Sequence, residues 1–218
     1  PSTVYVEVSN NDVDWSESGL DFVFQADSSV NSIHPTHGPE RGMTLVTVYG
    51  NHFVNSRHLG CRFGLISTQA HSFVSQNEIV CFAPDRRNLG RPGSVAVEVT
   101  NNNQTYTTNA ARYMYDESVL VSVLSPQSGP SSGQSRVVVY GYGFRDYPTL
   151  GCKFGDLQVK GFFITSSEIE CVTPAMPIQR TPIEVTLNGY DYSFSKVEFN
   201  VEPDVIITNI WPTMGPAY

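Results

Sequence analysis

The strongest constraint on this chain is that it repeats itself. The segment 60–64, Gly-Cys-Arg-Phe-Gly, returns at 151–155 as Gly-Cys-Lys-Phe-Gly, 91 positions further on. The segment 33–39, Ile-His-Pro-Thr-His-Gly-Pro, returns with the same displacement at 124–130 as Leu-Ser-Pro-Gln-Ser-Gly-Pro. Solenoid and propeller repeats are only about 20–50 residues long. A repeat of this length is therefore a whole domain, and the sequence predicts two complete copies.

Both ends of the chain resemble parts of further copies. Residues 6–11 match residues 97–102, and the Ile-x-Pro-x-x-Gly-Pro pattern occurs a third time at 210–216. We expect either that the polypeptide continues beyond both termini or that another copy completes each partial unit by strand addition. The predicted division is the C-terminal strands of a preceding unit at 1–28, complete units at 29–116 and 117–203, and the first strand of a following unit at 204–218.

The hydrophobic pattern within each unit has a period of two, which is typical of strands. Val46 and Val48, for example, alternate with Thr47 and Tyr49. Turn residues interrupt these runs about every ten residues, and the chain has 17 Gly and 14 Pro but only 16% charged residues. About seven short strands in some 90 residues predict an all-β fold of tandem immunoglobulin-like β-sandwiches.

Five residues of the first unit have matching residues in the second, and each leads to a specific structural expectation. We expect Gly38-Pro39 to end the first strand, because proline cannot donate to a β-ladder. Pro35, just before it, is expected to bend that edge strand between the two sheets. Gly50 is expected to form a turn or bulge, and Phe53 to fill the core.

The chain has four cysteines, two in each complete unit: Cys61, Cys81, Cys152 and Cys171. Pairing within each unit is the simplest solution, and four buried free thiols in a cytosolic protein are the alternative. Two disulfides closing loops of about 20 residues would each stabilise their unit by roughly 3 kcal/mol. Persistent disulfides would also indicate an oxidising compartment, and therefore an extracellular location, either secreted or at the cell surface.

Four motifs occur in order along each unit: Ile-x-Pro-x-x-Gly-Pro, a strand with Gly-x-x-Phe, Gly-Cys-x-Phe-Gly, and Glu-Ile-x-Cys-x-x-Pro. Taken together, this set resembles the IPT/TIG domain, an immunoglobulin-like sandwich of the E-set type. The version with cysteines is similar to the extracellular arrays of plexins and fibrocystin-like proteins, in which the matching cysteines form a disulfide within the unit. The resemblance therefore implies that Cys61 pairs with Cys81 and Cys152 with Cys171.

Composition disfavours two classes of partner. The net charge of −8 argues against nucleic acid, because phosphate binding depends on clustered Lys and Arg. The IPT/TIG domains of Rel-type transcription factors do bind DNA, but this chain lacks an accompanying basic recognition region. It also lacks a stretch of about 18 apolar residues, so we expect no membrane span in this segment.

The sequence carries no catalytic motif, and we expect neither an enzyme nor a cofactor. All five histidines fall in the first complete unit, and their counterparts in the second are other residues. A zinc site at His34 and His37 is conceivable, but exposed loop histidines are the simpler interpretation. Calcium is an alternative for the acidic residues at the unit junctions, but solvated acids in a short connector are the favoured interpretation: Asp27, Asp116, Glu117, Glu202 and Asp204.

Two further candidate sites lie in loops. Asn103-Gln104-Thr105 is an N-glycosylation sequon in a predicted hairpin turn, where a sugar could project into water. Arg86, Arg87 and Arg91 place three cations near a Pro-Gly turn and form a candidate binding loop, with simple solvation as the alternative.

These features predict a non-catalytic structural segment of a secreted or cell-surface repeat protein. The connector between the complete units is short, which favours a semi-rigid, rod-like array that assembles into a filament, appendage or coat. Its partners would be neighbouring units and other copies of itself. The alternative is a receptor-like adhesion or recognition module that binds a protein or glycan ligand through sandwich-end loops. An accessory carbohydrate domain ranks last, because Trp15 and Trp211 do not match one another.

Overall fold

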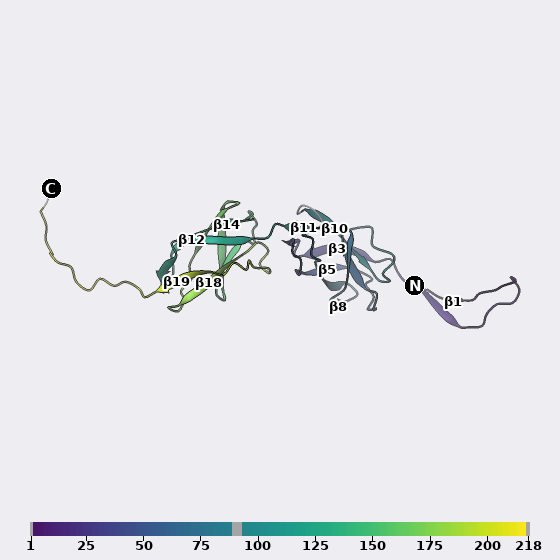
Figure 1. The fold of residues 1–218 in the computed structure, drawn as a ribbon. Coiled ribbons are helices and arrows are strands. Elements are labelled where there is room, and N and C mark those ends of the chain that lie inside the picture. Colours follow the sequence, from purple (N-terminus) through teal and green to yellow (C-terminus); the bar gives the residue numbers. More distant parts are fainter. Residues whose placement is uncertain (1, 89–92, 217–218) are drawn as a thin grey trace. The chain divides into compact units, whose positions relative to one another are not determined.

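The computed structural model describes residues 2–88 and 93–216. These residues form 19 strands and contain no helix, which confirms the all-β prediction (Figure 1). Nor do the described residues hold a helix that is long and apolar enough to cross a membrane. The chain divides into two compact units. The first comprises Pro1–Thr36, Leu45–Pro84 and Ser94–Tyr113, and the second comprises His37–Thr44, Asp85–Gly93 and Met114–Tyr218.

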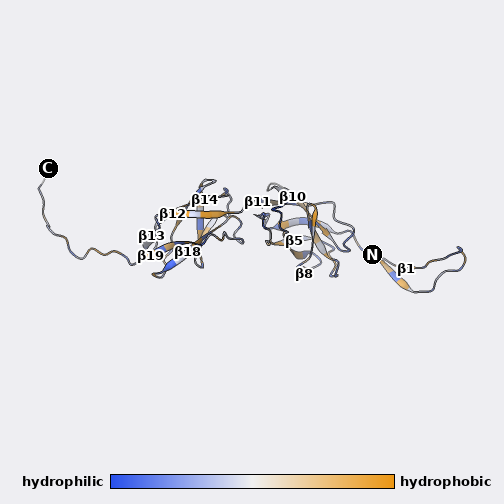
Figure 2. Ribbon diagram, viewed as in Figure 1, coloured by the Kyte–Doolittle hydropathy of each residue, from blue (hydrophilic) through white to orange (hydrophobic). Residues whose placement is uncertain are grey.

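The chain begins with an isolated hairpin. Strands β1 (Ser2–Val6) and β2 (Leu20–Phe24) pair antiparallel, with Val4 opposite Phe22. Every residue of both strands is exposed, including the apolar ones that Figure 2 colours orange along β1. This hairpin therefore has no buried core of its own.

Two sheets contain the strands of the first complete repeat. One has the order β3-β5-β9-β8 and the other the order β4-β11-β10-β6-β7. The strands are β3 (Ser29–His34), β4 (His37–Pro39), β5 (Leu45–Asn51), β6 (Gly60–Phe63), β7 (Ile66–Gln69), β8 (Ser72–Ser75), β9 (Glu78–Phe82), β10 (Ser94–Thr100) and β11 (Ala111–Asp116).

The second repeat follows the same order of strands in a single sheet, β12-β14-β17-β16-β15-β18-β19-β13. Its strands are β12 (Leu120–Ser125), β13 (Ser128–Pro130), β14 (Arg136–Tyr142), β15 (Gly151–Phe154), β16 (Leu157–Thr165), β17 (Glu168–Val172), β18 (Arg180–Thr186) and β19 (Val197–Glu202). The sheet is continuous because β16 pairs with both β15 and β17. In the first repeat the corresponding stretch is split into β7 and β8.

The two cores are built from the same positions in the two copies. Alternate residues of β5, such as Val46 and Val48, are fully buried, as the period of two requires. Phe63 and Tyr113 make an edge-to-face ring contact with centroids 5.5 Å apart. Phe154 and Phe199 repeat that contact at 5.9 Å in the second copy. Such a pair adds about 1 kcal/mol beyond the area that it buries.

The buried position of the Phe53 ring and the need for glycine at position 50 are linked. Phe53 is 2% exposed, so its predicted place in the core is confirmed. A Cβ on Gly50 would lie 2.4 Å from the Phe53 ring and 2.0 Å from the carbonyl oxygen of Ser29. The bulge is therefore not at Gly50 itself but on the paired strand β3, where the register shifts between Val30 and Ser32. Glycine is required here because the ring and the neighbouring backbone both approach it closely.

The first strand changes sheets at Pro35, as predicted. β3 belongs to the four-stranded sheet and β4 to the five-stranded one, and Pro35 lies between them. Gly38-Pro39 ends the first strand, as predicted, because β4 ends at Pro39. Both residues lie in β4, which runs parallel to β11 with Gly38 opposite Tyr115 and Pro39 opposite Asp116. Proline is tolerated because β4 is an edge strand and needs no donor on its open side.

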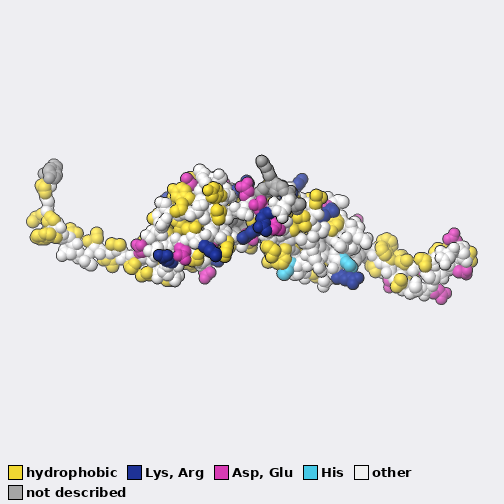
Figure 3. Space-filling model, in the orientation of Figure 1, with side chains coloured by type: hydrophobic (Ala, Val, Ile, Leu, Met, Phe, Trp, Pro, Cys, Tyr) yellow, Lys and Arg dark blue, Asp and Glu magenta, His cyan; other side chains and the backbone are white. Residues whose placement is uncertain are grey.

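The last described residues lie beyond β19 and form no strand. Their apolar side chains are exposed, with Val205 at 93% and Trp211 at 91%. Figure 3 shows hydrophobic side chains on the surface of this segment and of the N-terminal hairpin. Exposed apolar surface of this kind marks a place where a folded partner normally packs.

Candidate functional site

The carboxylate of Asp116 is a buried charge of the second unit with three side-chain partners. Asp116 ends β11 and is only 1% exposed. Nδ1 of His37 lies 2.8 Å from its Oδ2. The Tyr147 hydroxyl donates to its Oδ1 at 2.9 Å, and Nε of Arg145 lies 3.4 Å from the same oxygen. Parallel pairing of β4 with β11 brings His37 to this carboxylate.

Burial of this charge is compensated by its three partners. A buried carboxylate is costly unless it is paired and hydrogen-bonded, and here both oxygens have partners. The pKa of Tyr147 is raised to about 12, first because the phenol is buried and second because Asp116 is negatively charged. The phenol therefore stays protonated and remains a hydrogen-bond donor at neutral pH. The His37 and Tyr147 rings also lie against one another, with centroids 4.1 Å apart.

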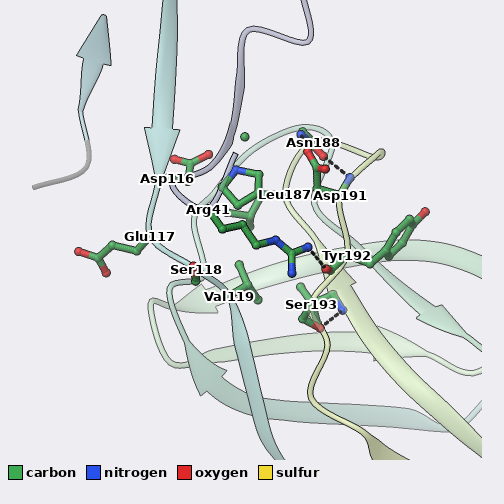
Figure 4. A pocket seen from close by; sticks show the side chains of 13 residues that line it. Arg41, Asp116, Glu117, Ser118, Val119, Leu187, Asn188, Asp191, Tyr192 and Ser193 are labelled. Carbon is green, nitrogen blue, oxygen red and sulfur yellow. Dashed lines mark hydrogen bonds between the residues drawn. The ribbon is translucent and has the colours of Figure 1, made fainter. Parts of the chain in front are cut away.

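A second polar group of the same unit is centred on Asn188, which is 3% exposed. Its Nδ2 donates to the carbonyl oxygen of His37 at 3.0 Å and to Oδ2 of Asp191 at 2.7 Å. The hydroxyl of Thr44, itself 1% exposed, donates to the same Asp191 oxygen at 2.7 Å. Arg41 completes the set, because its Nη2 donates to the Tyr192 carbonyl at 3.0 Å (Figure 4). The turn after β18 is thus held to the segment 37–44 by three polar contacts.

A small cavity lies among these residues. Its volume is about 90 Å³, and its lining includes Arg41, Asp116, Val119, Leu187 and Tyr192 (Figure 4). Sites for drug-sized ligands are usually about 300–1,000 Å³. The cavity is therefore too small for such a ligand, and the cluster acts chiefly as a set of packing and hydrogen-bonding contacts.

Several of the candidate histidines and junction acids contact other protein groups. Besides the pairing of His37 with Asp116, Nδ1 of His52 lies 2.9 Å from the Asp27 carbonyl oxygen. Asp204 accepts a hydrogen bond from the Ser132 backbone at 3.1 Å, and this bond lowers the pKa of the Asp204 carboxyl. Among residues 2–88 and 93–216, no three His, Cys, Asp or Glu side chains converge in a way that could hold a metal ion.

The cysteines are bonded within each repeat. Cys61 of β6 is joined to Cys81 of β9, and Cys152 of β15 to Cys171 of β17. The described chain contains no free cysteine. The first bond ties the five-stranded sheet to the four-stranded one, so it closes the sandwich across its core.

The predicted arginine loop is only partly described. Arg87 pairs with Asp85, which holds the pKa of that carboxyl at about 2 through a side-chain hydrogen bond. The Arg86 guanidinium lies over the Tyr115 ring, 5.5 Å from its centroid. Arg91 lies outside the described residues. The two described arginines are therefore already engaged within the protein.

The predicted sequon lies on a turn. Asn103, Gln104 and Thr105 are all exposed, and Asn103 has a positive φ of 58°. Tyr147, Asn188 and Asp191 were not predicted from the sequence as contact residues. For Asn188 and Asp191 a signal was available, because the same Asn-x-x-Asp spacing occurs at Asn11 and Asp14.

A family model of the IPT/TIG domain matches residues 28–115 and 120–201. Because the two matches cover most of the chain, the chain belongs to the IPT/TIG domain family, as two domains in tandem. The predicted family and fold class are confirmed.

Similar proteins are distant and much longer. Plexin-A3 of Mus musculus is 23% identical over 190 residues, which cover 84% of this chain and 10% of the plexin. Fibrocystin-L of Mus musculus is 24% identical over 155 residues, covering 66% of this chain and 4% of the relative. The extracellular region of plexin A4 superposes with a TM-score of 0.55 at 19% identity, over 94% of this chain and 18% of that one. The chain thus spans a tenth or less of the curated relatives, and the superposition supports the fold alone.

Proposed function

We propose that this chain is a non-catalytic structural segment of a secreted or cell-surface repeat protein. In this proposal the tandem IPT/TIG domains act as a semi-rigid spacer that sets the distance between other parts of the protein or between assembled copies. The extracellular location is supported by the two disulfides, which persist only in an oxidising compartment. It is also supported by the likeness to a segment of the plexin A4 extracellular region.

The main support for this proposal is that the side chain of Asp116 is buried and held by polar contacts. This residue begins the stretch 116–119 that separates the two family matches. A connector of only four residues restricts the swing of the domains on either side of it. Within the second unit, Asp116 is buried, and its carboxylate is held by His37, Tyr147 and Arg145. A buried, fully partnered charge resists movement, because any displacement exposes unpaired donors and acceptors.

The distribution of distances between two spin labels tests this proposal. Labels carried by unnatural amino acids at Leu65 and Asp156, both highly exposed positions, avoid exchange with the disulfides. A spacer should give a narrow distribution in the unmodified chain. A matched control carries a flexible Gly-Ser insertion after Glu117 and should give a broad one. An unmodified chain as broad as the insertion variant would overturn the spacer role.

The recognition alternative has less support. It assigns ligand binding to Arg86, Arg87 and Arg91, but Arg86 lies over Tyr115 and Arg87 is paired with Asp85. A ligand would have to compete with these intramolecular contacts. Binding of an anionic glycan that disappears in an Arg86→Ala, Arg87→Ala double variant would favour this alternative.

A further inference from the structure

Three turns of this chain are copies of one another. They span 8–16, 99–107 and 185–193, the last of which follows β18. In each turn, the backbone N–H of the last residue donates to the carbonyl of the first, at 2.9, 2.9 and 2.8 Å. The hydroxyl of the last residue accepts from the backbone N–H of the first, at 3.0, 3.0 and 2.9 Å. The internal repeat therefore supplies three versions of one local structure in a single chain.

The centre of each turn is an asparagine. The side-chain oxygens of Asn11, Asn102 and Asn188 each accept hydrogen bonds from two backbone N–H groups further along the turn. The next residue has a positive φ in every case, 62° at Asp12, 58° at Asn103 and 81° at Gly189. Asn103 therefore occupies the same backbone position as Gly189.

The turns differ in the residue three places after the central asparagine. In two turns it is an aspartate, which accepts the asparagine amide at 2.8 Å for Asp14 and 2.7 Å for Asp191. Asp191 also accepts the hydroxyl of Thr44, the contact that holds this turn to the segment 37–44. In the middle turn the residue is Thr105, which has no carboxylate to accept either bond.

Thr105 is also the residue that makes Asn103 a glycosylation acceptor. The sequon requires a hydroxyl residue two places after the asparagine, and an aspartate at that position would abolish it. One position therefore carries either the contact-making carboxylate or the sequon hydroxyl, but not both. The matching position, Gly189, shows that the turn leaves space for a modification, because a Cβ built there has no described atom within 4 Å.

We propose that Asn103 carries an N-linked glycan, and that the turn 99–107 is the glycan-bearing counterpart of the contact-making turn 185–193. This inference rests on the proposed extracellular role, because N-glycans are attached in the secretory pathway. Nδ2 of Asn103 would bond to the anomeric carbon of a lipid-linked oligosaccharyl pyrophosphate. The bond from that carbon to the pyrophosphate oxygen breaks, the amide gives up one proton, and the lipid pyrophosphate leaves.

The test is to secrete the chain from a eukaryotic cell line and to measure glycan occupancy by mass spectrometry, before and after treatment with peptide N-glycosidase. We expect one glycan, located at Asn103. It should be lost in Asn103→Gln and in Thr105→Asp and kept in Thr105→Ser. Loss of the glycan in Thr105→Asp is the most informative result. An aspartate at this position restores the carboxylate acceptor found in the other two turns and should leave the fold intact.

A gain-of-function variant tests whether the turn itself presents the acceptor. Asp12→Asn combined with Asp14→Thr introduces the sequon into the exposed N-terminal turn and should add a second glycan. A secreted, disulfide-bonded chain without sugar at Asn103 would overturn this inference and leave the proposed function standing. A chain that is retained in the cell with free thiols would count against the extracellular role and the glycan together.

Discussion

The hydroxyl of Tyr147 donates a hydrogen bond of 2.9 Å to Oδ1 of the buried carboxylate of Asp116. The charged carboxylate and the protonated phenol stabilise one another. The carboxylate needs donors because it has lost its water. The pKa of the phenol is raised first because the phenol is buried and second because the carboxylate is charged. The pair therefore links the stability of the second unit both to the identity of these side chains and to pH.

Removing the carboxylate should destabilise the second unit. Asp116→Ala leaves the Tyr147 hydroxyl and the His37 Nδ1 group without their acceptor, and we expect the free energy of unfolding to fall by about 3 kcal/mol. Tyr147→Phe removes one hydrogen bond and should cost about 1 kcal/mol. Urea denaturation measures both changes, and Glu117→Ala, at an exposed neighbour, is the matched control. Equal stability of Asp116→Ala and Glu117→Ala would contradict the role given to Asp116.

The second unit should lose stability in alkali through Tyr147. The pKa of its phenol is about 12 in the folded protein and about 10 in an unfolded chain. Because the folded value is the higher one, this contribution is fully present below pH 10 and is lost as the pH rises through about 12. Urea midpoints measured at pH 8, 10 and 11.5 should fall less steeply for Tyr147→Phe than for the unmodified chain.

Tyr142→Phe serves as the control for that titration, since Tyr142 is 64% exposed and should behave like the unmodified chain. If all three proteins weaken equally between pH 10 and 12, another group is responsible.

Each disulfide should stabilise its own repeat. The two bonds join cysteines that are 20 and 19 positions apart in the sequence. In the loop-entropy description, each bond restricts the unfolded chain and so raises the free energy of unfolding by about 3 kcal/mol. We expect the Cys61→Ala, Cys81→Ala pair to weaken the first repeat and the Cys152→Ala, Cys171→Ala pair the second, as measured by thermal unfolding. Alkylation without reductant should modify no cysteine of the unmodified chain. Labelling of any thiol before reduction would show that the pairing is incomplete.

Adding one methyl group at Gly141 should disrupt the second repeat. A Cβ there would lie 2.0 Å from the Leu120 carbonyl oxygen and 2.8 Å from the Phe144 ring, so the paired backbone would have to move. We expect Gly141→Ala to lower the free energy of unfolding by about 3 kcal/mol. Gly93→Ala is the control, because no described atom lies within 4 Å of a Cβ at that position. Denaturant unfolding that does not distinguish the two variants would refute the proposed close approach.

The sequence was sufficient to predict the repeat, the all-β sandwich and the buried position of Phe53. These features depend on local patterns. Alternating apolar residues define the buried face of a strand whatever its partner is. Glycine and proline mark turns through their own backbone preferences. The internal repeat strengthened each inference, because every motif could be read twice in one chain.

The contacts of Asp116 with His37 and Tyr147, and that of Asp191 with Thr44, were decided by the tertiary structure. They join residues far apart in the sequence, and the pairing of β4 with β11 is what brings His37 beside Asp116. From the sequence, Asp116 resembled any acid in a short connector. A periodic pattern specifies which side of a strand is buried, but burial of a polar group depends on non-local partners that can satisfy it, and only the folded chain brings them together.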